Sequence, residues 1–303
     1  MNRAPPRAVY ALIGWPLDHS LSPAMHNAAF VTLGIPATYA LRPTSPDDLP
    51  AMIDELRFGA LAGANVTVPH KVAVRRYLDD ESDLVTGIGA VNTIVRTESG
   101  LFGHNTDGVG FRTALEAMNM LDGAGKQAVV LGAGGAARAV VHTLLRAGYA
   151  VRILARSTSQ SGTVAAQLYR AHPGAMLATG LLAPEAVVAE GERSELLVNA
   201  TPVGAPNDIG LWPLGVPIPA HLTVIDLVAW PLETPLVRHA LVCGARAIGG
   251  FEMLLGQAAR AFTLWTGRAA PCEVMRAAGI AAAAENATST GLIGGGSWVE
   301  EAG

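Results

Sequence analysis

A lysine and an aspartate in the sequence stand where they could exchange protons. Lys71 falls in the first turn of a helix expected over residues 69–78. The positive end of a helix dipole disfavours a structural lysine and eases its deprotonation, which suits a proton-transferring group; an exposed lysine is the alternative. Asp107 begins a second predicted helix, which it could cap, or it could pair with Lys71 at the mouth between two domains. His104 is a weaker acid–base candidate.

Hydroxyl and amide side chains near this lysine form a polar surface. Asn65 and Thr67 point to the same side of a strand expected over residues 63–68, because side chains alternate along a strand. Ser20 and Ser22 lie on a strand-to-helix turn, where hydroxyls and the first helical N–H groups suit a small carboxylate. Helix capping alone explains Ser22, which is expected as the N-cap, but it does not explain Ser20.

A glycine-rich loop directly follows an apolar strand predicted over residues 128–131. The loop consists of Gly132, Ala133, Gly134, Gly135, Ala136 and Ala137. This G-x-G-x-x-A pattern between a strand and a helix is typical of a dinucleotide site, because the glycines permit a tight turn and the first helical N–H groups face the pyrophosphate. A tight turn without a ligand is the alternative.

The end of the next predicted strand, residues 150–155, indicates which dinucleotide would bind. An NAD site places an acidic residue about 20 residues beyond the loop, where it holds the ribose 2′-hydroxyl. Here the strand ends in Arg156, Ser157 and Thr158, with no carboxylate. A cation and hydroxyls favour a 2′-phosphate and therefore NADP, and a solvated surface arginine is the alternative.

Composition restricts the class of protein. The 303 residues suggest about two domains, and 50% hydrophobic with 15% charged residues excludes a disordered chain. A net charge of −4 argues against nucleic-acid binding. Cys243 and Cys272 have no metal-ligand spacing and cannot build a disulfide framework, so we expect no metal and a cytoplasmic setting. The longest uncharged run, residues 209–225, contains three prolines and predicts no membrane helix.

Strands alternate with helices along much of the chain, which predicts an α/β fold with a parallel, doubly wound sheet. Strands are expected over residues 9–14, 38–42, 63–68, 89–96, 100–104, 128–131, 150–155, 196–200, 223–228 and 245–248. Helices are expected over residues 22–34, 45–58, 69–78, 107–120, the stretch up to 147, 249–266 and 271–285. The Ser/Thr/Gly-rich residues 286–303 are expected to form a loose tail.

Taken in order, these segments resemble the shikimate dehydrogenase family, including its quinate/shikimate relatives. The segments that carry the resemblance are His19–Pro23, Asn65–Lys71, Gly89–Thr93, Asn105–Gly108, the glycine loop, Val198–Pro202 and Gly249–Gln257. The resemblance implies an N-terminal α/β substrate domain, residues 1–107, and a Rossmann-type NADP domain, residues 108–249. It also implies that helices over residues 250–285 return to the first domain, in a monomer or homodimer.

The resemblance also implies an activity, the reversible NADPH-dependent reduction of 3-dehydroshikimate to shikimate in aromatic amino-acid biosynthesis. Lys71 and Asp107 would be the catalytic pair. The residues implied in substrate binding are Ser20, Ser22, Asn65, Thr67, Asn92 and Gln257. Those implied in cofactor binding are residues 132–137, Arg156, Ser157, Thr201, Leu227 and Gly250. Quinate or aminoshikimate dehydrogenase with relaxed cofactor use, and a non-catalytic ligand sensor, are the alternatives.

At three positions this sequence differs from the residues that are usual in the family it resembles. Gln160 replaces a second basic residue, which weakens the expected preference for NADP over NAD. Ala229, followed by Trp230, replaces a tyrosine near the substrate, and Glu252 replaces a glycine. These last two changes would widen or recharge the pocket and so alter the choice between shikimate and quinate.

Overall fold

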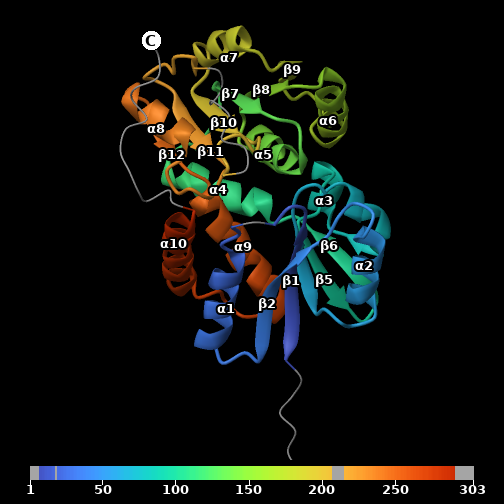
Figure 1. Cartoon of the computed structure of the whole chain (residues 1–303). Coiled ribbons are helices and arrows are strands. Elements are labelled where there is room, and N and C mark those ends of the chain that lie inside the picture. The colour runs from blue at the N-terminus through green and yellow to red at the C-terminus, as the bar shows by residue number, and fades with distance from the viewer. Residues whose placement is uncertain (1–6, 18, 207–214, 291–303) are drawn as a thin grey trace, which may run out of the picture.

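The computed structural model describes residues 7–17, 19–206 and 215–290 of the chain. It consists of two six-stranded sheets, one above the other in Figure 1, each covered by helices. Part of the uncharged run 209–225 and most of the predicted tail 286–303 lie outside the described residues. Within these ranges, no helix is both long and apolar enough to cross a membrane.

The first sheet comes from the N-terminal third of the chain. Its strands are β1 (Ala8–Gly14), β2 (Ala37–Pro43), β3 (Gly63–Val66), β4 (Asp80–Glu81), β5 (Thr93–Thr97) and β6 (Gly100–His104). Their order in the sheet is β2-β1-β3-β5-β6-β4. Strand β1 is parallel to β2 and β3, whereas β5 is antiparallel to β3 and β6. The sheet is therefore mixed, whereas the alternation of strands and helices predicted a parallel sheet.

Both faces of the first sheet are buried. The helices that cover it are α1 (Ser22–Thr32), α2 (Leu49–Arg57), α3 (Asp83–Ile88), α9 (Phe251–Thr266) and α10 (Cys272–Ser289). Along β1, Tyr10 and Leu12 pack with α1, α9 and α10, and the alternate residues Ala11 and Ile13 pack with α2. This alternation follows from the two-residue period of a strand and explains why residues 9–14 are almost entirely apolar.

The helix predicted over residues 69–78 does not form. Only Ala73–Tyr77 are helical, as a short 3-10 helix, and Lys71 lies in the turn before it. An α-helix would use the Lys71 carbonyl to accept from the amide four residues on. Here that carbonyl accepts from the Val91 N–H at 2.7 Å instead. The predicted effect of a helix dipole on Lys71 was therefore wrong.

The second sheet is fully parallel. Its strands are β7 (Gln127–Leu131), β8 (Ala150–Ala155), β9 (Leu177–Leu181), β10 (Leu196–Asn199), β11 (Thr223–Asp226) and β12 (Arg246–Ile248). Their order, β12-β11-β10-β7-β8-β9, is that of the doubly wound dinucleotide-binding sheet. The helices of this part are α4 (Asp107–Ala117), α5 (Gly135–Arg146), α6 (Thr158–Ala171), α7 (Pro184–Gly191) and α8 (Pro235–Val242). Helices α4, α5 and α6 pack on one face, and α7 and α8 on the other.

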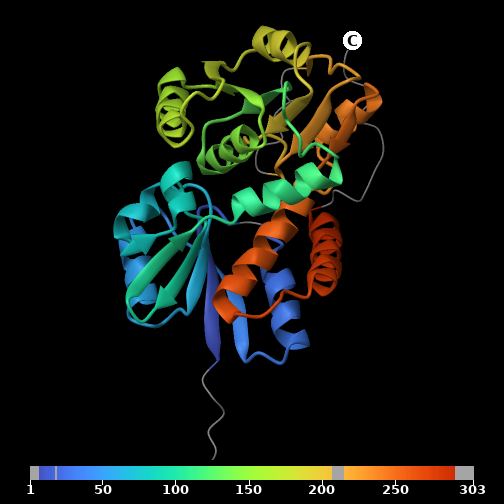
Figure 2. The same ribbon diagram turned by 180° about the vertical axis from the view of Figure 1, so that it is seen from behind.

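Two helices carry the chain between the sheets. Helix α4 leads to the second sheet, and α9 leads back, so that α10 lies beside α1 on the first sheet (Figures 1 and 2). The two crossing helices approach closely, because a Cβ at Gly110 would lie 2.2 Å from the Met253 carbonyl oxygen. Helix α10 continues to Ser289, so residues 286–289 belong to the helix and not to the predicted tail.

Candidate active site

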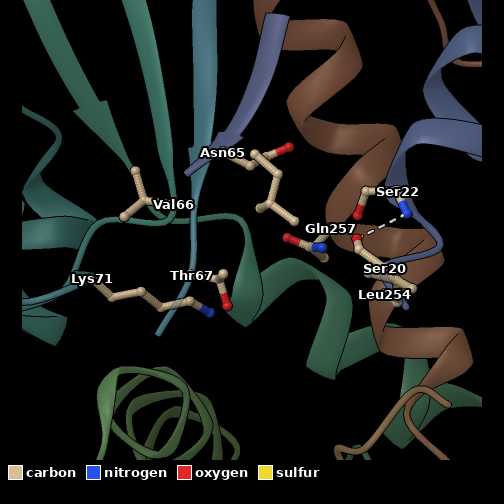
Figure 3. A pocket seen from close by; sticks show the side chains of 9 residues that line it. Ser20, Ser22, Asn65, Val66, Thr67, Lys71, Leu254 and Gln257 are labelled. Carbon is tan, nitrogen blue, oxygen red and sulfur yellow. Dashed lines mark hydrogen bonds between the residues drawn. The ribbon is translucent and has the colours of Figure 1, made fainter. Parts of the chain in front are cut away.

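A cavity of about 140 Å³ opens at the carboxyl end of β1 and β3. Its lining residues are Leu12, Ser20, Ser22, Asn65, Val66, Thr67, Lys71, Leu254 and Gln257. Figure 3 shows Lys71 and Thr67 on one side of this cavity, Ser20 and Ser22 on the other, and Gln257 between them. Five of the six predicted substrate-binding residues thus share one cavity with the predicted catalytic lysine.

Lys71 and Asp107 form an ion pair. Lys71 Nζ lies 2.6 Å from Asp107 Oδ2, and the two side chains are 13% and 4% exposed. Thr106 is the N-cap position of α4, so Asp107 is the first residue of the helix and its carboxylate makes no capping hydrogen bond. The capping alternative for Asp107 was wrong, and the pairing alternative is confirmed.

Asn92 holds this pair from behind the cavity. Its side-chain amide lies 2.8 Å from Asp107 Oδ1 and 2.9 Å from Gln257 Oε1, to both of which it can donate. Its Oδ1 accepts from the Thr106 N–H at 2.7 Å. Asn92 does not line the cavity, whereas Lys71 and Gln257 do. The structure therefore brings Asn92 to the Lys71–Asp107 ion pair and not to the cavity wall.

The structure of the turn before α1 differs from the expectation for the two serines. Helix α1 begins at Ser22 itself, with Leu21 at the N-cap position and no side-chain cap. The Ser22 N–H donates to Ser20 Oγ at 3.3 Å (Figure 3). Ser22 is therefore not the N-cap, and Ser20 is the serine whose hydroxyl accepts from the start of the helix. Both side chains face the cavity.

Asn65 of the cavity lining is held by a buried tyrosine that the sequence did not reveal. The buried Tyr39 hydroxyl donates to Asn65 Oδ1 at 2.9 Å, and Asn65 Nδ2 donates to Thr93 Oγ1 at 3.0 Å. Burial raises the pKa of Tyr39. These bonds fix the orientation of the Asn65 amide. Strand β2 was predicted correctly, but its alternation does not distinguish a structural tyrosine from a functional one.

The glycine loop makes a tight turn into helix α5. Gly132 has a φ of +102°, and a Cβ there would lie 3.0 Å from the Ala200 carbonyl oxygen. Helix α5 begins at Gly135, and within the described residues no side chain caps it and no acidic residue lies in its first turn. Its first N–H groups are thus left for an anion at the positive helix end. A Cβ at Gly135 would lie 2.7 Å from Lys71 Cβ, so the loop directly adjoins Lys71.

Other predicted cofactor residues follow the neighbouring strands at the same edge of the sheet. Arg156 is exposed, and Ser157 is the N-cap of α6, whose Oγ accepts from the Gln160 N–H at 3.2 Å. Thr201 and Leu227 follow β10 and β11, and the Gly250 N–H donates to the Val228 carbonyl at 3.0 Å. In doubly wound sheets, this edge beside the first strand is where dinucleotides bind.

A buried carboxylate connects two of these loops. Asp226 Oδ1 accepts from Asn199 Nδ2 at 2.8 Å, and its Oδ2 accepts from Thr234 Oγ1 at 2.6 Å. The Asn199 Oδ1 in turn accepts from the Thr201 hydroxyl at 2.6 Å. Burial raises the pKa of Asp226 to about 6, although these hydrogen bonds oppose the shift.

The departures from the family pattern lie outside the cavity lining. Glu252 pairs with Arg276 of α10 through both carboxylate oxygens, so its charge is compensated. The Trp230 indole donates to the Ala283 carbonyl at 3.0 Å, and its ring lies 4.9 Å from that of His19. Neither side chain recharges the cavity.

His104 takes no part in the cavity. Its ring lies 4.8 Å from that of Phe102, and burial, followed by the charge of Arg260, lowers its pKa. The described residues contain no group of three His, Cys, Asp or Glu side chains that could hold a metal ion.

A doubly wound sheet with a glycine loop, facing a lysine–aspartate pair in a hydroxyl-lined cavity, defines a two-domain dehydrogenase that uses a pyridine nucleotide. Residues 12–94 match the family described as "Shikimate dehydrogenase substrate binding domain", and residues 250–278 match "Shikimate 5'-dehydrogenase C-terminal domain". The chain belongs to the shikimate dehydrogenase family.

Individual relatives agree with this assignment. The chain is 43% identical over 279 residues to "Shikimate dehydrogenase (NADP(+))" of Moorella thermoacetica, covering 88% of this chain and 90% of that one. The structure of the Thermus thermophilus shikimate 5-dehydrogenase in complex with NADP(H) and shikimate is similar, with 37% identity, a TM-score of 0.76 and coverage of 91% and 99%. A quinate dehydrogenase from Corynebacterium glutamicum in complex with NAD is also similar, with 30% identity, a TM-score of 0.78 and coverage of 91% and 100%.

Proposed function

We propose that this protein catalyses the reversible reduction of 3-dehydroshikimate to shikimate by NADPH, a step of aromatic amino-acid biosynthesis. The observation that carries the proposal is the Lys71–Asp107 pair, which lies between a hydroxyl-lined cavity and the glycine loop. The curated relatives named as NADP(+)-dependent shikimate dehydrogenases support the same activity.

The chemistry follows from the position of Lys71. Bound NADPH supplies the hydride that reduces the ring ketone. As the hydride arrives, negative charge develops on the ketone oxygen, and the Lys71 ammonium donates the proton that completes the hydroxyl group. Asp107, 2.6 Å away, holds the ammonium in place. In the reverse direction Lys71 takes up the hydroxyl proton.

The two sides of the cavity suit different groups of the substrate, its carboxylate and its ring hydroxyls. Ser20 and Ser22 lie at the start of α1, where hydroxyls and a helix N-terminus favour a carboxylate. Asn65, Thr67 and Gln257 offer amide and hydroxyl groups to the ring hydroxyls. Asn92 orients Gln257, which binds these hydroxyls, and it orients Asp107, which holds the proton donor Lys71.

The cofactor assignment rests on the helix N-termini and loops that follow the strands of the second sheet. The first N–H groups of α5, residues 135–137, suit the pyrophosphate, and Gly132, with its positive φ, forms the tight turn that precedes them. Arg156 and Ser157 at the start of α6 suit the 2′-phosphate of NADP. We place the nicotinamide end among Thr201, Leu227 and Gly250.

The choice among dehydroshikimate, dehydroquinate and amino analogues is tested by a substrate panel with both cofactors. Loss of NADPH absorbance should be fastest with 3-dehydroshikimate, and shikimate should be oxidised with a higher kcat/KM than quinate. Equal or reversed values would favour the quinate alternative. An absence of turnover with every substrate, alongside measurable shikimate binding, would favour a ligand sensor.

We propose that residues 1–107 with residues 250–289 form the substrate-binding unit, and residues 108–249 the NADP unit. The free thiols of Cys243 and Cys272 support a reducing, cytoplasmic location. Because one chain supplies every residue that lines the cavity, a monomer or a homodimer would both be active, which light scattering of the active enzyme can distinguish.

A further inference from the structure

One face of α5 packs against the substrate domain along its whole length. Gly135 adjoins the Lys71 side chain, and Ala139, one turn later, shares a buried apolar cluster with Ile88 and Ala90. His142 lies another turn on, where a Cβ at Gly87 would meet its ring at 3.2 Å. Residues three and four apart share a helix face, so Arg138 belongs to this face too.

Arg138 is a buried cation on this face of α5. It is 6% exposed, and burial lowers the pKa of its guanidinium. Within the described ranges no acidic side chain pairs with it, its Nε has no partner, and its Nη1 donates to Gln167 Oε1 at 2.7 Å. Burying a charge in this way is costly, so the bond from Arg138 fixes the Gln167 amide firmly in one orientation.

Gln167 extends from α6 of the NADP domain to the last turn of helix α3 in the substrate domain, which ends at the C-cap residue Gly89. Its Nε2 donates to the Thr86 carbonyl at 3.4 Å. Gly89, just beyond, has a φ of +78°, and a Cβ there would lie 2.0 Å from the same Nε2. The amide of Gln167 therefore occupies the space that a side chain at position 89 would need.

The turn under Gln167 leads directly to the acid–base pair. Two residues after Gly89, the Val91 N–H donates to the Lys71 carbonyl at 2.7 Å. The next residue is Asn92, whose amide lies 2.8 Å from Asp107 Oδ1. Both members of the catalytic pair are thus held by the three residues that follow the turn.

We propose that Gln167, oriented by the buried Arg138, is a positioning residue for catalysis. It holds the turn from Thr86 to Gly89, and through that turn it sets Asn92, Asp107 and the main chain of Lys71. Because Gln167 belongs to the NADP domain, the catalytic pair is fully ordered only when the two domains are docked as they are here. This inference rests on the proposed function.

The test compares the steady-state kinetics of Gln167→Ala and Gln167→Glu with those of the wild type, varying shikimate or NADP while the other is saturating. Gln167→Ala should lower kcat about tenfold, within the range typical of residues that act through a network. The KM values for shikimate and NADP should change less than twofold, since Gln167 touches neither cavity nor glycine loop. Gln127→Ala, an exposed glutamine on β7, is the matched control and should leave kcat unchanged.

Gln167→Glu separates positioning from folding. The glutamate gives Arg138 a carboxylate, so the melting temperature should equal or exceed that of the wild type. It cannot donate to the Thr86 carbonyl and repels it, so kcat should fall as in Gln167→Ala. A kcat within twofold of the wild type in Gln167→Ala would overturn the inference, as would recovery of both kcat and melting temperature in Gln167→Glu. An inactive wild type would overturn the proposed function and this inference with it.

Discussion

Replacement of Lys71 by alanine is the most direct test of the catalytic assignment. The change removes the proton donor but leaves the opposite wall of the cavity, with Ser20 and Ser22, intact (Figure 3). We therefore expect a large loss in kcat and a small change in the KM for shikimate. Lys71→Met is the matched variant, because it keeps most of the aliphatic stem that packs against Gly135.

The size of the effect follows from the role of the ammonium group. General acid–base groups contribute about 10²–10⁴-fold to rate, which is roughly 3–5 kcal/mol of activation free energy. The substitution also removes the partner of a carboxylate that is 4% exposed. Leaving one member of a buried ion pair alone costs about 3–5 kcal/mol, although the Asn92 amide at 2.8 Å offsets part of it. The folded fraction of each variant must therefore be measured.

The assay is steady-state oxidation of shikimate, with kcat corrected for the folded fraction by thermal denaturation. Asp107→Asn should also lower kcat strongly while preserving shape, and the double variant should lose less than the product of the two effects. A folded Lys71→Ala enzyme with near-normal kcat would refute the assignment of Lys71 as the proton donor.

Three further predictions concern binding and stability. Ser22→Ala should cost roughly 0.5–3 kcal/mol of shikimate binding, seen as a higher KM at little change in kcat; an unchanged KM would contradict the carboxylate assignment. Arg156→Ala should raise the KM for NADP and leave that for NAD nearly unchanged, whereas equal responses would mean that Arg156 does not contact the 2′-phosphate. Asp226 has a native pKa of about 6, above its ordinary 3.8, so its ionisation costs the folded state about 3 kcal/mol. This cost is absent below pH 3.8 and complete above about pH 6; denaturant titrations should therefore show unfolding free energy depending less on pH in Asp226→Asn, and an unaltered dependence would argue against a buried, ionised Asp226.

The sequence alone was sufficient to predict a structural element where the residues of that element determine its conformation. Strand β7 and the loop from Gly132 to Ala137 follow from an apolar run that ends in glycines, a pattern with one common structural solution. Strand β1 was equally clear, because both of its faces are buried and nearly all its residues are apolar.

Sequence reasoning failed where a partner distant in the chain decides the structure. The segment after Pro69 has helix-compatible residues, but the Val91 N–H takes the Lys71 carbonyl, and the helix cannot begin there. Similarly, Tyr39 and Gln167 resemble any strand tyrosine or helix glutamine. Their importance comes from Asn65 and from Arg138, which lie 26 and 29 residues away in the sequence.

The return of α9 and α10 to the first sheet has a consequence for synthesis on the ribosome. Tyr10 and Phe30 share their apolar cluster with Phe262 and Met275, so one face of the N-terminal sheet stays uncovered until the C-terminal helices emerge. All strands of the second sheet lie between residues 127 and 248. This sheet can therefore form before α9 and α10 cover the first sheet, although its strands are synthesised after those of the first sheet. The nascent chain therefore exposes one apolar face of its first sheet for most of translation, and this face is the surface a chaperone would meet first.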